Sequence, residues 1–231
     1  MVSTDVSGHF DSTGLLPGLR QAQLHVKTTT PYTVPGVPVT LTVRFNDVPD
    51  DNQFEAFIYG AAGAGVMFGG PPNCPAGILS FCPDNVVTRA DMAGYLWRAA
   101  MGANTPPPVY QNIFHDVTFN QYNSFYIQGM FDLGVTAGCG GGNYCPDVPV
   151  TRAQMSALVW KDQHGDEAPP PCTGVFNDVP CPDGFAVDYI EGLYNEGIVV
   201  GCGNGNFCPN VGITNGQMSV FLVKAFNIPH L

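Results

Sequence analysis

Apolar residues recur at intervals of three and four in paired segments of the chain, and a glycine-rich loop separates the two segments of each pair. This spacing is typical of one buried helix face, so it predicts a helix, a loop and a second helix. The plan is clearest near the C-terminus, where Gly197 stops the first helix and Thr214 begins the second. The apolar positions there are Val187, Ile190, Leu193 and Tyr194 before the loop, and Met218, Phe221, Leu222 and Ala225 after it.

The first 43 residues follow a different pattern, because apolar and polar residues alternate along them. The alternation is clearest at residues 23–26 and 37–43, and it predicts two or three strands. So few strands cannot close a sandwich. We therefore expect this half-sheet to pack on the helical part or to pair its edge with another chain.

The helix-loop-helix plan repeats with a period of 63 residues. Cys82, Cys145 and Cys208 share this interval, and each is followed by a proline. Such a period indicates stacked structural units, and a unit of about 60 residues buries too little apolar surface to be stable alone. We therefore predict a mainly α fold in which three helix-loop-helix repeats form a pseudo-threefold bundle behind a short N-terminal β segment. The expected boundaries are 1–43 for the β segment, 44–108 for the first unit, 109–171 for the second and 172–231 for the third.

The cysteines fall into four pairs of near neighbours. An even number of local pairs in an acidic, lysine-poor chain indicates disulfides and an oxidising compartment. Zinc is the alternative, but the pairs lack the two-residue spacing and the nearby histidines of common zinc sites. We expect disulfides, with no metal and no other cofactor. The pairs are Cys74 with Cys82, Cys139 with Cys145, Cys172 with Cys181, and Cys202 with Cys208.

Charge and hydropathy limit the kinds of partner and environment that the chain suits. The chain has 8 Lys and Arg against 19 Asp and Glu, a net charge of −11, which argues against nucleic acid as a partner. The longest apolar stretch, residues 56–68, is too short and too rich in glycine to span a membrane. Residues 1–10 show no signal-peptide pattern, so we interpret the sequence as a mature or truncated part of a longer exported precursor.

The starts of the second helices carry the strongest candidate chemistry. A threonine at each start and a Asp or Gln three residues later predict a capping box. Arg89 and Arg152 occupy the first turn of two of these helices, where the helix dipole is unfavourable to a cation, so we expect an anionic partner for each. A guanidinium beside free helix amides suits an acidic sugar or a carboxylate. The expected capping residues are Thr88 with Asp91, Thr151 with Gln154, and Thr214 with Gln217.

The repeats resemble the S-layer homology (SLH) repeats of bacterial cell-surface proteins. The resemblance rests on Phe-x-Asp-Val at the front of each unit, on Gly-Ile/Val-x-x-Gly at residues 134–138 and 197–201, and on Thr-Arg-Ala before an apolar helix. It implies a central three-helix bundle with grooves that hold cell-wall glycan, in which Arg89 and Arg152 contact the acid group. Because Asn215 replaces the arginine in the third unit, at most two such sites are implied.

The aspartates of the Phe-x-Asp-Val segments, Asp47, Asp116 and Asp178, have two interpretations. They contact glycan, or they cap the first helix of each unit, and we favour the cap. The first 43 residues resemble the closing strands of a bacterial immunoglobulin-like domain, so this β segment is expected to be a partial immunoglobulin-like sheet.

Together these features predict a non-catalytic, extracellular structural protein of a bacterial cell surface that docks to cell-envelope polysaccharide. The alternative is a self-assembling subunit of an extracellular filament or surface layer, in which copies are joined through the N-terminal strands and the repeats. An enzyme is not expected, because the five histidines share no spacing and no nucleophile or metalloprotease motif occurs.

Overall fold

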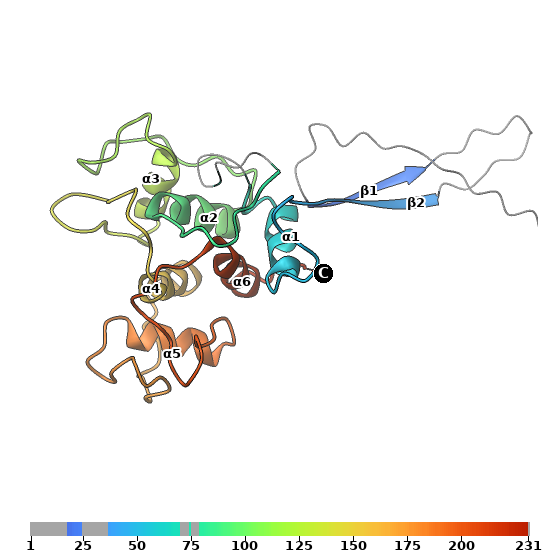
Figure 1. Cartoon of the computed structure of the whole chain (residues 1–231). Helices are drawn as coiled ribbons and strands as arrows, with labels where there is room; N and C mark the ends of the chain where they lie inside the picture. The colour runs from blue at the N-terminus through green and yellow to red at the C-terminus, as the bar shows by residue number, and fades with distance from the viewer. Residues whose placement is uncertain (1–17, 25–36, 70–73, 75–78, 231) are drawn as a thin grey trace, which may run out of the picture.

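A computed structural model describes residues 18–24, 37–69, 74 and 79–230. In these residues two strands precede six helices, so the predicted mainly α fold class is confirmed (Figure 1). None of the helices in the described ranges is long and apolar enough to cross a membrane. The elements are β1 (Gly18–Leu24), β2 (Val37–Val43), α1 (Glu55–Gly63), α2 (Arg89–Met101), α3 (Ser124–Asp132), α4 (Arg152–His164), α5 (Val187–Asn195) and α6 (Asn215–Ala225).

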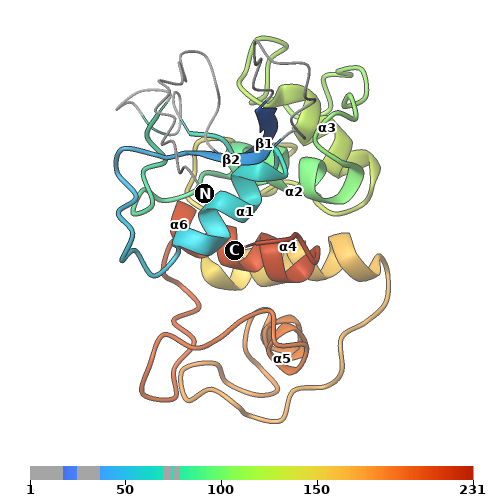
Figure 2. The same ribbon diagram turned by 90° about the vertical axis from the view of Figure 1, so that its right-hand side faces the viewer.

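Each long helix packs on the short helix of the following unit. Thus α2 packs on α3 and α4 packs on α5, while α6 returns to α1 and closes a ring. Figure 2 shows α3 and α5 on opposite sides of α4. Glycines allow the close approach: a Cβ at Gly129 would lie 2.5 Å from the ring of Trp97, and one at Gly192 would lie 2.6 Å from that of Trp160. Any larger side chain at these positions would push the helices apart.

Three backbone hydrogen bonds join the units at the centre of this ring. The N–H of Val87 donates to the carbonyl of Ile213, that of Ile213 to Val150, and that of Val150 to Val87, each at 2.9 Å. All three residues are completely buried, and they keep the 63-residue interval. A single apolar core surrounds them and draws residues from all three units.

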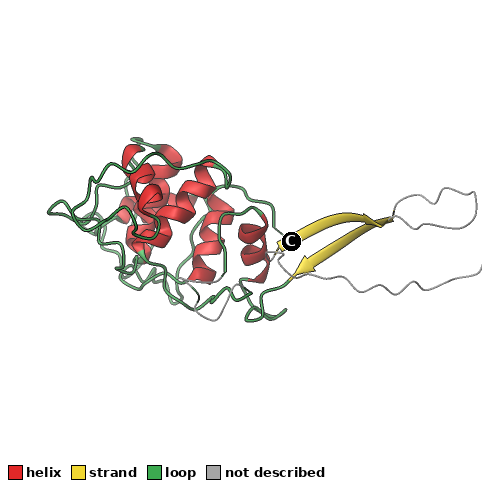
Figure 3. Cartoon of the chain, turned by 90° about the horizontal axis from the view of Figure 1, so that it is seen from above, coloured by secondary structure: helices red, strands yellow, loops and turns green. Residues whose placement is uncertain are grey.

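The strands β1 and β2 form an antiparallel hairpin that stands away from the helices (Figures 1 and 3). Its register runs from Gly18 opposite Val43 to Leu24 opposite Val37. The end at Val43 leads directly into the helical body, and there β1 lies beside α1. The predicted strand segment at 23–26 lies inside the described residues only as far as Leu24.

Candidate functional site: the loops and the groove at Arg89

The cysteine pairing predicted from the sequence is confirmed, because all four near-neighbour pairs are disulfide-bonded. Three of these bridges close the loop between the short and the long helix of a unit. The second cysteine of each loop adopts a positive φ, with values of 53° at Cys82, 60° at Cys145 and 61° at Cys208. This turn leaves two backbone N–H groups without a partner in regular secondary structure, and they need an acceptor.

The Phe-x-Asp-Val aspartates supply that acceptor. Asp116 accepts the N–H groups of Tyr144 and Cys145, both at 2.7 Å. Asp47 and Asp178 hold the first and third loops through the equivalent pairs of N–H groups at 2.7–2.8 Å. The expectation that these aspartates cap the first helices is therefore wrong. The capping positions of α1, α3 and α5 are Phe54, Asn123 and Ala186, and none of them caps the helix through its side chain.

Both oxygens of each aspartate are thus occupied by backbone N–H groups. Each carboxylate therefore satisfies the end of its own loop, and the short helix begins several residues further along the chain. A glycan contact by Asp47, Asp116 or Asp178 stays a prediction.

Each long helix begins with a capping box. The side chain of Thr88 accepts the N–H of Asp91, and the carboxylate of Asp91 accepts the N–H of Thr88 at 3.0 Å. The same reciprocal pair joins Thr151 to Gln154 and Thr214 to Gln217. These caps fix the first turn of the helix, and therefore the direction in which the following side chain, Arg89 in α2, leaves the backbone.

Both first-turn arginines are buried and reach the cysteine-closed loop of the following unit. Arg89 Nε donates to the carbonyl of Tyr144 at 2.7 Å, and its guanidinium lies 4.7 Å from the centre of the Tyr144 ring. Arg152 Nε donates to Phe207 at 2.8 Å, and Arg152 Nη2 donates to Val200 at 2.7 Å. Neither arginine is ion-paired with a carboxylate in the part of the chain that the structure describes. The anionic partner expected from the helix dipole is replaced, within the protein, by carbonyl oxygens and an aromatic face.

Burial shifts the pKa of one group at each of the two arginine contacts. Desolvation lowers the pKa of Arg152, while Asp178 opposes that effect. Burial also raises the pKa of Tyr144, whose hydroxyl donates to the carbonyl of Arg89 at 2.8 Å. The third contact is different, since Asn215 donates through Nδ2 to Cys82 at 3.0 Å and its buried Oδ1 has no partner among the described residues.

A second set of cations was missed in the sequence, although it keeps the same interval. Arg98, Lys161 and Lys224 each lie in the last turns of a long helix. Arg98 Nε donates to the carbonyl of Val66 at 2.9 Å, and Lys224 Nζ donates to that of Gly197 at 3.1 Å, so each binds a carbonyl two or three residues past the end of a short helix. The side chain of Lys161 makes no hydrogen bond or ion pair with any residue that the structure describes.

Arg89 and Lys161 line one groove of about 450 Å³ between the second loop, α4 and the approach to α5. Two aromatic residues, Phe185 and Tyr189, lie along the same groove, and Phe185 is 70% exposed. The sequence did not single out either aromatic residue. The groove therefore combines two cations with aromatic faces, which suits an acid group carried on a sugar ring. Its other lining residues are Val135, Thr136, Ala137, Gly138, Cys139, Cys145, Val148, Gln154, Ala157 and Leu158.

A family model described as "S-layer homology domain" matches residues 123–156 and 176–219. These two segments of the chain are S-layer homology sequence. The first matched segment begins at the cap of α3 and includes Arg152, and the second extends from Phe176 into α6. The predicted family is thus confirmed over these two segments, and the first unit lies outside them.

Two relatives carry similar sequence. The chain is 32% identical over 49% of its length to a protein named endoglucanase from Bacillus sp. (strain KSM-635), of which it covers 12%. It is 30% identical over 51% of its length to a cell surface protein of Thermoanaerobacter kivui, of which it covers 16%. The chain therefore spans a small part of these relatives. The S-layer homology domains and the second relative assign the chain to the cell surface.

Proposed function

We propose that this chain anchors to the cell envelope by binding an acidic polysaccharide in the groove at Arg89. One observation carries the proposal: Lys161 lines the same groove as Arg89, and no described residue forms a hydrogen bond or ion pair with its side chain. A lysine kept without a partner beside a second cation favours an anionic ligand. Phe185 and Tyr189 offer apolar faces for the sugar ring.

The two equivalent positions elsewhere in the ring have fewer cationic groups available to bind an acid. At the second, Arg152 already donates to two carbonyls, and Lys224 donates to a third. At the remaining position Asn215 carries no charge, and Arg98 is buried against Val66. We therefore propose one acid-binding site per chain, at Arg89, with Arg152 serving as a clamp between units.

The first unit, residues 44–108, is proposed as a third repeat of the same kind. The bonds of Asp47, the capping box of Thr88 and the place of Val87 in the central ring support this assignment. The chain itself is proposed to be non-catalytic, since the endoglucanase relative is matched over only 12% of its length.

Self-assembly is proposed as a second role, as in a filament or surface layer. The hairpin favours it, because β1 and β2 stand away from the helices and a two-stranded sheet is marginally stable alone (Figure 3). Light scattering coupled to size-exclusion chromatography measures this directly. A mass that stays monomeric up to millimolar concentration would remove the second role and leave the first untouched.

Binding to purified cell-wall polysaccharide, measured by calorimetry at low salt, tests the first role. Lys161→Ala is expected to weaken binding about tenfold or more, because a charge-assisted hydrogen bond contributes about 1.5–3 kcal/mol. Lys224→Ala is the matched control at the equivalent position of the third unit, and it is expected to leave affinity within twofold. Arg89→Lys keeps the charge but loses the planar fork, so we expect an intermediate loss. The reverse order, with Lys224 critical and Lys161 silent, would place the site elsewhere.

A further inference from the structure

We propose that two copies of this chain associate by pairing their β1 strands antiparallel about a two-fold axis at Gln21. The inference rests on the self-assembly proposed above, and it names the surface, the symmetry and the register. Among the residues that the structure describes, neither β1 nor β2 has a second neighbour in the sheet, so each has one unpaired edge. Unpaired edges are templates for another strand, and their backbone groups are satisfied when one is added.

Proline decides which edge is available. Pro38 lies opposite Gln23 in the register. It has no N–H, so its backbone nitrogen is accommodated where it faces away from the partner strand. Because hydrogen-bonded and non-hydrogen-bonded pairs alternate, this places the outward-facing groups of β2 at Pro38, Thr40 and Thr42 and those of β1 at Leu19, Gln21 and Gln23. The edge of β2 therefore lacks one donor, whereas the edge of β1 has every N–H and C=O.

The outward-facing positions of β1 are self-complementary. With a two-fold axis at Gln21, the central pair is Gln21 with Gln21 of the second copy, and Leu19 lies opposite Gln23 on either side. These are the positions whose backbone groups face outward, so about six hydrogen bonds form between the copies. The result is a four-stranded sheet with β1 from both copies at its centre, which is more stable than two isolated hairpins.

The charge pattern of β1 also permits this register. Arg20 is the single charged residue of the strand, and about a two-fold axis at Gln21 it lies opposite Ala22 of the second copy. No like charges are opposed, and no lysine or glutamate protects the edge against pairing. The net negative charge of the chain comes from residues 44–231, and the hairpin lies beside α1 at its Gly18–Val43 end and extends away from the helices beyond it (Figure 1).

A cysteine at the two-fold axis tests the register in the complete, oxidised chain. Every native cysteine is bonded within the chain, so Gln21→Cys adds one free thiol per copy. Opposed residues of a hydrogen-bonded pair lie about 5.5 Å apart at Cα, within the range of a disulfide. We expect Gln21→Cys to form covalent dimers at least tenfold more than Gln163→Cys, the same substitution at an exposed position of α4. Equal crosslinking by both variants, or none by Gln21→Cys in a sample that light scattering shows to be oligomeric, would overturn the β1 edge and leave self-assembly standing.

Two substitutions at one position then test the pairing by charge. Ala22→Glu places a carboxylate opposite each Arg20, and Ala22→Arg places a like charge there. Two cross-strand pairs per dimer predict that the dissociation constant falls roughly threefold to tenfold for Ala22→Glu and rises by a similar factor for Ala22→Arg, as measured by sedimentation equilibrium. Shifts of the same sign for both variants would contradict this register. A monomer in every variant and at every concentration would defeat self-assembly itself.

Discussion

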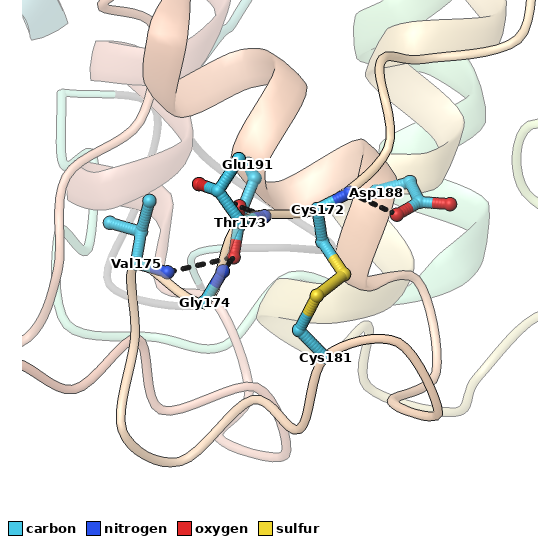
Figure 4. Close-up of a disulfide and its surroundings, with 7 residues drawn as sticks. All are labelled: Cys172, Thr173, Gly174, Val175, Cys181, Asp188 and Glu191. Carbon is cyan, nitrogen blue, oxygen red and sulfur yellow. Dashed lines mark hydrogen bonds between the residues drawn. A yellow bond between two sulfur atoms is a disulfide. The ribbon is translucent and has the colours of Figure 1, made fainter.

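The leading segments of the second and third units, residues 109–123 and 172–186, are held against their short helices by different interactions. In the second unit, Phe119 lies edge-on to Tyr110 and Phe125, with ring centres 6.0 and 5.3 Å away. In the third unit, Cys172 and Cys181 occupy the places of Tyr110 and Phe119 in the repeat, and they form a disulfide (Figure 4). A covalent bridge therefore replaces a ring contact.

The residue of the short helix that binds the leading segment also differs between the two units. Glu191 on α5 is 1% exposed, and its carboxylate accepts the N–H groups of Thr173, Gly174 and Val175 (Figure 4). Its counterpart in α3 is Gln128, which accepts a single N–H, that of Gln111. Burial raises the pKa of Glu191, but the hydrogen bonds from residues 173–175 outweigh that effect and lower it overall. The third unit is thus held by a charge and a bridge where the second is held by an amide and three rings.

In the first unit, exposed ion pairs take the place of these interactions. Arg44 forms ion pairs with Asp50 and with Glu55, and the side chain of Asp50 is 85% exposed. Exposed pairs of this kind contribute little to stability. One backbone plan therefore tolerates three chemistries at the same place, and we expect the leading segments to differ in how strongly they are held.

Removing the bridge of the third unit is expected to have the largest effect. Replacing Cys172 and Cys181 by serine opens the loop between two cysteines that have a sequence separation of 9. Because the unfolded chain is then less constrained, the free energy of unfolding is expected to fall by about 2–3 kcal/mol. Denaturant titration measures it. Phe119→Ala at the equivalent place in the second unit is the control, and it is expected to cost less than about 1 kcal/mol, because Phe119 is 61% exposed. Equal losses would contradict the comparison.

Glu191→Gln is expected to have the next largest effect. It removes the charge from a carboxylate that accepts three backbone N–H groups, at a cost of about 2 kcal/mol at pH 7. Because the folded pKa lies below the usual 4.5, this stabilisation is present above pH 4.5 and is lost as pH falls through the folded pKa. Denaturant titrations between pH 2 and 7 should therefore show wild type and variant converging at low pH. A difference that is the same at pH 2 and pH 7 would mean that the charge is not the cause.

Arg44→Ala is expected to have the smallest effect. Since the guanidinium is exposed to solvent, the denaturation midpoint should stay within experimental error at 0.15 M salt, and any small change should disappear as salt is raised. Titrations at two salt concentrations check this. A loss as large as that of the third-unit bridge would show that exposure is a poor guide to how these segments are held.

Much of this architecture was predictable because it depends on short-range rules. The helices around Met155 and Met218 follow from apolar spacing, and Thr151 and Gln154 form the predicted capping box. Long-range partners were not predictable. Asp116 resembles a helix cap in sequence, but its acceptor role is set by N–H groups of the loop, 28 and 29 residues away.

In the candidate site, too, the short-range features were predictable from the sequence and the long-range partners were not. The interval drew attention to Arg89, but it could not show that the second cation, Lys161, has no bonding partner in the part of the chain that the structure describes. That difference depends on whether a carbonyl at the end of a neighbouring helix lies within reach, as it does for Lys224. The aromatic residue Phe185 lines the groove but belongs to the following unit, so no local sequence pattern predicts its place there.

The hydrogen bonds among Val87, Val150 and Ile213 also restrict how such a protein can change in evolution. An open array of repeats grows by one whenever a repeat is duplicated, because its last member always presents a surface for the next. In a closed cycle every donor at the axis has its acceptor, so a fourth unit finds no vacancy there and the loss of one leaves two buried groups unpaired. Gain or loss of length is therefore expected in threes, as whole rings added or removed along a chain.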